Sequence, residues 1–150
     1  MTAETMTSNQ TIVTEFLAAF EDLDVDRALT YVSRDIEYQN VPFPVVRGFD
    51  KFEKRMRGFT SKGTGYEAEI INIAANGPIV LTERIDVTIR KNWRARFWVC
   101  STFEVRDGKI ILWREHYDWV SVLASSVKGL FGAAVSGLRS QPYQKPKAKS

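Results

Sequence analysis

The 150-residue sequence predicts an α+β fold, in which helices pack against one face of a curved, antiparallel sheet. Two observations lead to this prediction. Apolar residues recur at helical spacing in the first part of the chain, and from residue 66 they alternate with polar residues, as they do in strands. The dipeptides Asn76-Gly77 and Asp107-Gly108 then mark tight hairpin turns between successive strands. We find no internal repeat and no sign of a second domain.

Three helical segments are expected before the strands. Residues 9–21 carry apolar side chains at helical spacing, and Ser8 or Asn9 is a suitable N-terminal cap. Residues 24–32 have the pattern of a shorter helix. Residues 49–60 have that of a third helix, with aromatic and methionine side chains along one side.

Strands account for most of the remaining chain. Residues 36–40 alternate between apolar and polar side chains, and the prolines that follow end this first strand. A turn is also expected at Lys91-Asn92, although its signal is weaker than those of the two glycine-containing turns. The later strands are expected at 66–75, 78–90, 93–106 and 109–119.

The C-terminal part is apolar but rich in serine, glycine and alanine. We expect residues 119–138 to form a helix that packs on the domain or forms a dimer. A helix on a membrane surface and a membrane-spanning helix are alternatives, but Lys128 interrupts a run of marginal length. The domain is thus expected to cover residues 9–138, between a flexible N-terminus (1–8) and a disordered basic tail (139–150).

Composition and charge restrict the class of protein. The net charge of +3 is a property of the tail, because residues 139–150 hold four basic residues and no acid, which leaves 17 basic and 18 acidic residues elsewhere. This balance does not indicate a nucleic-acid-binding surface. Cys100 is the only cysteine, so no intrachain disulfide can form, and the first ten residues lack the features of a signal peptide. We expect a cytoplasmic protein.

Glu115 is an unusual residue for the apolar face of a strand. In the strand expected at 109–119, it shares one face with large apolar and aromatic side chains. Burial there would raise the pKa of its carboxyl group unless a cation or hydrogen bonds stabilised the charge. An edge position in contact with water is an equally acceptable alternative. His116, the only histidine, lies on the opposite face and is interpreted as structural.

Two further polar pairs are candidates, although each has an ordinary explanation. Arg84 and Asp86 share a face of one strand, where they could also form a solvated ion pair of little energetic value. Tyr38 and Asn40 share a face of the early strand and could hold a water molecule or simply be polar residues at a strand end. The sequence contains no metal-binding His/Cys cluster, phosphate-binding glycine loop or nucleophile elbow.

Taken together, three segments resemble the signature segments of the limonene-1,2-epoxide hydrolase family. They are Tyr38–Pro42, Leu81–Asp86 and Leu112–Glu115, and their order and spacing agree over roughly residues 10–120. The stretch Phe97–Cys100 and the extended C-terminal helix resemble the actinobacterial branch. The resemblance implies an NTF2-like (SnoaL-like) cone, in which a curved, mixed and mostly antiparallel sheet is wrapped by helices around a deep pocket.

The resemblance also implies a reaction, which is the one-step hydrolysis of an epoxide to a vicinal diol without metal, cofactor or covalent intermediate. Asp86 would be the general acid that protonates the epoxide oxygen. Glu115 would be the general base for a water molecule that Tyr38 and Asn40 also hold, and Arg84 would orient both carboxylates. The family further implies a homodimer.

One position departs from the family pattern, because the family usually has aspartate where this chain has Glu115. The additional methylene moves the carboxylate by about 1 Å, and a misplacement of this size can cost about 10²-fold in rate. The water site is then shifted to match, or the hydrolase is weak, or the pocket performs another acid–base reaction. A ketosteroid-isomerase-like or cyclase reaction and a non-catalytic ligand-binding domain therefore remain alternatives.

The wall of the pocket depends on the turn at Asp107-Gly108. A two-residue turn would place Cys100 opposite Glu115, whereas a three-residue loop with a bulge would place Val99 there. The family pattern favours Val99. The expected lining suits an apolar epoxide such as a terpenoid, steroid or lipid, and consists of Leu17, Phe20, Phe97, Val99, Trp113 and Tyr117.

Overall fold

The computed structural model describes residues 6–61 and 64–136 and confirms the α+β class. The expectations for residues 1–5 and for the tail 139–150 lie outside the described residues. The helices are α1 (Ser8–Glu21), α2 (Val25–Leu29), α3 (Phe49–Phe59) and α4 (Trp119–Ser136). The strands are β1 (Val32–Val41), β2 (Val46–Arg47), β3 (Thr64–Asn76), β4 (Ile79–Arg90), β5 (Trp93–Arg106) and β6 (Lys109–Tyr117).

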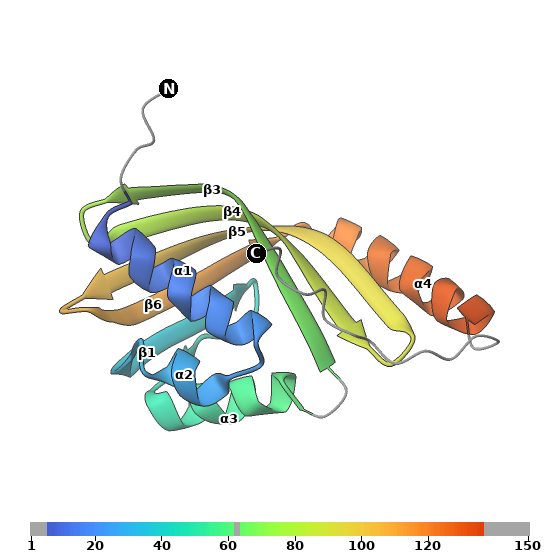
Figure 1. The fold of residues 1–150 in the computed structure, drawn as a ribbon, viewed down its shortest axis with the longest axis horizontal. Helices are drawn as coiled ribbons and strands as arrows, with labels where there is room; N and C mark the ends of the chain where they lie inside the picture. Colours follow the sequence, from blue (N-terminus) through green and yellow to red (C-terminus); the bar gives the residue numbers. More distant parts are fainter. Residues whose placement is uncertain (1–5, 62–63, 137–150) are drawn as a thin grey trace, which may run out of the picture.

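The strands form one open, curved sheet in the order β2-β1-β6-β5-β4-β3 (Figure 1). β1 runs parallel to β6, and the other neighbouring pairs are antiparallel. Helices α1, α2 and α3 cover the concave face, whereas α4 lies apart from them along β5 (Figure 1). The predicted packing of helices on one face therefore holds for the first three.

The start of α1 and the end of α2 differ from the predictions. Thr7, rather than Ser8 or Asn9, caps α1, because its hydroxyl accepts a 3.2 Å hydrogen bond from the Gln10 amide while the Gln10 side chain accepts one of 2.6 Å from the Thr7 amide. This capping box sets the start of α1 at Ser8. Helix α2 ends at Leu29, and the chain then enters β1 instead of continuing as a helix to residue 32.

The core lies between α1 and the concave face of the sheet. Phe16 of α1 is fully buried, with its ring centroid 5.1 Å from that of Trp113 on β6. Phe103 of β5 stacks on the same indole at 5.7 Å. Burying such aromatic side chains supplies a large share of folding free energy, so this cluster holds α1 against the sheet.

The more polar face of β4 is buried, although the apolar pattern of the strand favours burial of the other face. The even-numbered residues Val80, Thr82, Arg84 and Asp86 are buried on the side covered by helices, whereas Leu81 on the other side is 51% exposed. Because helices cover the concave face, its polar residues are removed from water in spite of the apolar pattern on the other face. The interpretation of Arg84 and Asp86 as a solvated surface pair is therefore wrong.

The hairpin between β5 and β6 sets the register at the site. Asp107 and Gly108, with φ values of 49° and 73°, form a two-residue turn with Arg106 opposite Lys109. A shift in register follows between Glu104 and Val105, and Ser101 therefore lies opposite Glu115. The expectation that Val99 or Cys100 would lie there is wrong. The prediction considered a tight turn or a bulged loop, whereas the structure combines a two-residue turn with a register shift further along the strands.

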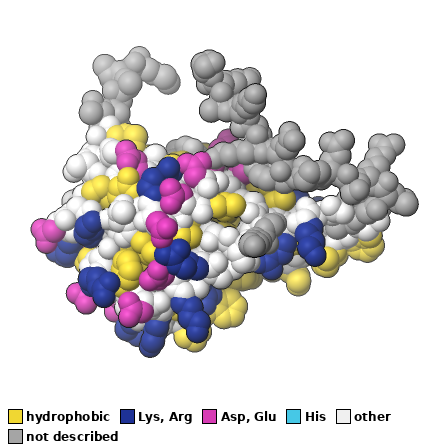
Figure 2. All heavy atoms as spheres, turned by 60° about the horizontal axis from the view of Figure 1, so that its bottom comes forward, with side chains coloured by type: hydrophobic (Ala, Val, Ile, Leu, Met, Phe, Trp, Pro, Cys, Tyr) yellow, Lys and Arg dark blue, Asp and Glu magenta, His cyan; other side chains and the backbone are white. Residues whose placement is uncertain are grey.

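Helix α4 packs on the sheet, and the Trp93 indole donates a 3.2 Å hydrogen bond to the Ser126 carbonyl. No helix in the described part of the chain is long and apolar enough to cross a membrane. Val120, Leu123, Leu130 and Phe131 remain exposed on α4. The side of the molecule that carries α2 and α3 shows acidic and basic side chains interspersed with apolar ones (Figure 2).

Candidate active site

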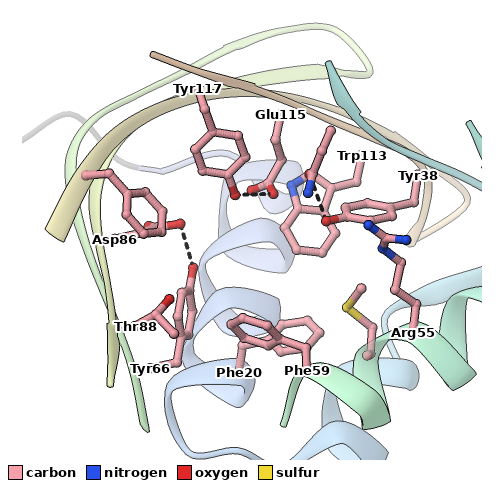
Figure 3. Close-up of a pocket in the computed structure, with 13 residues that line it drawn as sticks. Phe20, Tyr38, Arg55, Phe59, Tyr66, Asp86, Thr88, Trp113, Glu115 and Tyr117 are labelled. Atoms are coloured by element: carbon pink, nitrogen blue, oxygen red, sulfur yellow. Dashed lines mark hydrogen bonds between the residues drawn. The ribbon is translucent and has the colours of Figure 1, made fainter. Parts of the chain in front are cut away.

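A cavity of about 300 Å³ lies between the sheet and helices α1 and α3 (Figure 3). Its wall contains Phe20, Phe97, Trp113 and Tyr117, as expected. Leu17 and Val99 are buried but do not line it. The remaining lining residues are Tyr38, Asn40, Arg55, Met56, Phe59, Tyr66, Asp86, Thr88 and Glu115. The wall is thus mostly aromatic, with two carboxyl groups.

Arg84 lies behind these carboxyl groups and joins them. Its Nε and Nη2 donate to the two oxygens of Asp86 at 2.9 and 3.1 Å, and Nη2 also donates to Glu115 Oε1. Nη1 donates to Thr82 Oγ1 at 3.1 Å and to Ser101 Oγ at 2.7 Å. All five N–H donors of this fully buried guanidinium are therefore used, and its position is fixed.

Glu115 is buried within the sheet, because β6 lies between β1 and β5. The interpretation of Glu115 as an edge residue in contact with water is wrong. Besides Arg84, its carboxylate accepts a 2.6 Å hydrogen bond from the Tyr117 hydroxyl to Oε2 and a 3.4 Å one from Ser101 to Oε1. Burial raises the pKa of Glu115, while the charge of Arg84 and the hydrogen bond from Tyr117 oppose that rise.

Asp86, like Glu115, accepts a hydrogen bond from a tyrosine. The buried Tyr66 hydroxyl donates a 2.9 Å hydrogen bond to Asp86 Oδ2 from the neighbouring strand β3 (Figure 3). Burial raises the pKa of Tyr66 well above its usual value, so its hydroxyl stays protonated and available as a donor. Sequence reasoning missed this residue, although its position at the start of an expected strand could have placed it on the inner face.

Tyr38 and Asn40 lie next to Glu115 because β1 pairs in parallel with β6. In this register Tyr38 lies opposite Trp113, and Asn40 lies opposite Glu115. The two side chains also contact each other, since the Tyr38 hydroxyl donates a 2.8 Å hydrogen bond to Asn40 Oδ1. The Asn40 amide nitrogen and a Tyr38 lone pair therefore remain available to hold a small molecule.

The indole of Trp113 provides one more polar group at the site. Its Nε1 is buried and has no hydrogen-bond partner among the described residues. The Trp113 ring centroid lies 4.8 Å from that of Tyr38, so this donor lies in the same part of the wall as Tyr38 and Asn40. An unsatisfied buried donor is costly unless a ligand or water completes it.

Helix α3 contributes a part of the wall that sequence reasoning missed, consisting of Arg55, Met56 and Phe59. The Arg55 guanidinium lies over the Tyr38 ring, 5.7 Å from its centroid. Within the two described ranges, no group of three or more His, Cys, Asp or Glu side chains is arranged to hold a metal ion. His116 is exposed and points away from the cavity, beside Cys100 on the other face.

This arrangement of a curved sheet, wrapping helices and a central pocket defines an NTF2-like protein. An NTF2-like protein of Burkholderia pseudomallei, 14% identical, superimposes with a TM-score of 0.68 over 81% of this chain and 98% of that one. At this identity the likeness concerns the fold alone.

Comparisons with closer relatives identify the family. The sequence model of the limonene-1,2-epoxide hydrolase catalytic domain matches residues 7–128, and the chain belongs to this family. Epoxide hydrolase EphG of Mycobacterium tuberculosis is 36% identical over 127 residues, which is 85% of each chain. The structure of an M. tuberculosis LEH-like epoxide hydrolase, 35% identical, superimposes with a TM-score of 0.80 over 85% of this chain and 96% of that one.

Proposed function

We propose that the protein hydrolyses an apolar epoxide to a vicinal diol by general acid–base catalysis in one step, without a covalent intermediate. The observation that carries this proposal is the buried guanidinium of Arg84, which joins Asp86 and Glu115 at the wall of an aromatic cavity. A pocket that only bound an apolar ligand would gain nothing from two buried carboxyl groups that share one cation.

The reaction needs proton transfer at both ends, because water is a poor nucleophile and an alkoxide is a poor leaving group. Glu115 removes a proton from a water molecule that Tyr38 and Asn40 help to hold. The water oxygen forms a bond to one epoxide carbon as the carbon–oxygen bond of the ring breaks, and Asp86 donates its proton to the ring oxygen. Each such transfer typically contributes about 10²–10⁴-fold to the rate.

The shared cation lets the site hold one acid and one base. Two carboxyl groups that share one cation can hold one proton between them, so that one member is an acid and the other a base. Burial raises the pKa of Glu115, which makes its carboxylate a stronger base near neutral pH. After each turnover the proton gained by Glu115 returns to Asp86, and the charge of the site is unchanged.

The contacts of Glu115 support its use as the base despite the departure from the family pattern. Both carboxylate oxygens have donors, with Arg84 and Ser101 on Oε1 and Tyr117 on Oε2. These contacts hold the longer side chain in one position, and precise placement of a base matters for catalysis.

Single-turnover hydrolysis in ¹⁸O-labelled water tests the proposal. Limonene, styrene and steroid epoxides are each mixed with excess enzyme, and label in the diol formed in the first turnover is the expected result. A covalent carboxylate ester would instead yield unlabelled diol first. Asp86→Asn and Glu115→Gln are expected to lower the rate by at least about 10²-fold.

Glu104→Gln is the matched control, because Glu104 pairs with Arg106 on the same sheet and does not line the cavity. It is expected to keep the wild-type rate. If no epoxide is hydrolysed and a β,γ-unsaturated ketone is isomerised instead, the proposal is wrong and the isomerase-like alternative is favoured.

A further inference from the structure

A basic groove lies directly beside the cavity on the outside of α3. It is lined by Val45, Val46, Arg47, Lys51, Lys54, Arg55 and Gly58, none of which is acidic. Arg55 lines both the groove and the cavity. Val46 of β2, which lines the groove, lies opposite Tyr38 of β1, which lines the cavity.

Three of the four cations in this groove have no carboxylate partner. Arg47 forms a 3.0 Å ion pair with Glu37, but Lys51, Lys54 and Arg55 form no ion pair with any described residue. Acidic side chains are present on this side of the molecule (Figure 2), and Asp50 and Glu53 have arginine partners of their own, Arg34 and Arg57. The groove is therefore a site of uncompensated positive charge.

Arg55 lies on the opposite side of the cavity from the acid. In the close-up, its guanidinium reaches from α3 toward Tyr38, while Asp86 and Tyr66 lie across the cavity from it (Figure 3). Between these polar ends the wall is formed largely by aromatic side chains, including Phe20, Phe59 and Trp113. The acid Asp86 and the cation Arg55 therefore lie at opposite ends of a largely aromatic wall.

We infer that the substrate is an amphiphilic epoxide with an anionic group, and that Arg55 holds this group while the epoxide lies at Asp86 and Glu115. Lys51 and Lys54 attract the anion along the groove. This inference rests on the proposed function and adds a substrate class to it. A carboxylate or a phosphate would supply the anionic oxygens, and the planar guanidinium can bind either with two parallel hydrogen bonds.

A purely structural role for Arg55 would be to lie over the Tyr38 ring and to interact with the Tyr38 hydroxyl. An exposed cation–π contact of this kind stabilises only weakly and requires no other cation nearby. It explains neither the two unpaired lysines on the same turn of helix nor the absence of an acidic residue from the groove lining. The two roles make different predictions for charged and neutral substrates.

The first experiment compares straight-chain terminal epoxy acids of increasing length with their methyl esters. The wild-type protein is expected to show a higher kcat/KM for the acid than for the ester, with an optimum at one chain length. Arg55→Gln is expected to lower the acid-to-ester ratio by about tenfold to hundredfold, the range of a charge-assisted hydrogen bond. Sodium chloride at 0.5 M is expected to reduce the same ratio by screening.

Arg57→Gln is the matched control on the same helix, because Arg57 pairs with Asp26 and Glu53 and lines neither the cavity nor the groove. It is expected to leave the ratio within about twofold. Equal kcat/KM values for acid and ester in the wild type, or an equal effect of Arg55→Gln on both, would overturn the inference. In that case hydrolysis of the ester that depends on Asp86 and Glu115 would leave the proposed function intact.

Binding provides a second measurement that does not require turnover. Dodecanoate, dodecyl phosphate and dodecanol are titrated into the wild type and Arg55→Gln by calorimetry. Both anions are expected to bind about tenfold or more tightly than the alcohol, and to lose this advantage in the variant. The anion with the larger advantage identifies the head group. Equal affinity for the alcohol and both anions would refute the anionic subsite.

Discussion

The Tyr117 hydroxyl donates a 2.6 Å hydrogen bond to Glu115 Oε2, two residues earlier on the same strand. Side chains at i and i+2 of a strand point to the same face, so Glu115 and its hydrogen-bond donor are placed together by local geometry alone. Tyr117 is therefore a positioning residue. It stabilises the ionised form of a carboxylate that burial would otherwise favour in its protonated form.

Tyr117→Phe is expected to raise the pKa of Glu115 further, because it removes a hydrogen bond to the charged form. The proposed base must be ionised to act, so the acid limb of the kcat/KM profile should move to higher pH while the maximum falls only modestly. Tyr31→Phe, which removes a surface hydrogen bond to Glu15, is the control and should leave the limb in place. An acid limb at the same or a lower pH would contradict this role for Tyr117.

Glu115→Asp restores the residue usual in the family and is expected to lower activity. The shorter side chain withdraws the carboxylate by about 1 Å from Arg84 and Tyr117, so kcat should fall by about tenfold to hundredfold. Steady-state kinetics with the best epoxide substrate measure this change. A gain in kcat would instead mean that the glutamate is a compromised base and that its contacts are not adapted to catalysis.

Arg84→Gln is expected to destabilise the fold by about 3–5 kcal/mol at pH 7, because it leaves two buried carboxyl groups without a cation. Their repulsion and desolvation cost disappear when they are protonated, so the loss should shrink as the pH falls toward about 4. Urea unfolding across this range measures both effects. Arg57→Gln, which removes a surface arginine, should leave the free energy of unfolding close to the wild-type value at every pH. Equal losses for the two variants would contradict the prediction.

Gly129→Ala is expected to loosen α4 from the sheet. A Cβ atom at Gly129 would lie 2.4 Å from the Arg94 carbonyl oxygen, a distance that requires the helix backbone to move. Such overpacking typically costs about 1–3 kcal/mol. Gly132→Ala is the control on the same helix, because its Cβ would meet no atom within 4 Å, and it should be neutral or stabilising by up to about 1 kcal/mol. Thermal unfolding compares the two, and similar melting temperatures would argue against the close packing of α4.

The sequence predicted every element except the short strand β2, and most of the cavity wall, but it did not predict which faces are buried. Alternation places Arg84 and Asp86 on one side of a strand, yet it does not reveal that helices cover that side. The same limit made an exposed position for Glu115 equally acceptable. Burial is decided by contacts between distant segments, which a local pattern does not contain.

The sequence also did not predict the register between neighbouring strands. The turn at Asp107-Gly108 was expected, but the shift beyond it brings Ser101, instead of Val99 or Cys100, opposite Glu115. Tyr66 was missed for a similar reason, because its contact with Asp86 crosses between two strands. The five polar residues drawn from the family resemblance do meet at one place in the structure, and their catalytic roles stay predictions.

The parallel pairing of β1 with β6 brings Tyr38 and Asn40 beside Glu115 from the opposite end of the domain. The hairpins from β3 to β6 connect neighbours in the chain, whereas this pairing closes a long loop, and such contacts form slowly. A chain with its hairpins complete but β1 undocked would hold most of its sheet and still lack Tyr38 and Asn40, which we propose hold the water. The recovery of epoxide hydrolysis during refolding would then report the rate at which β1 pairs with β6.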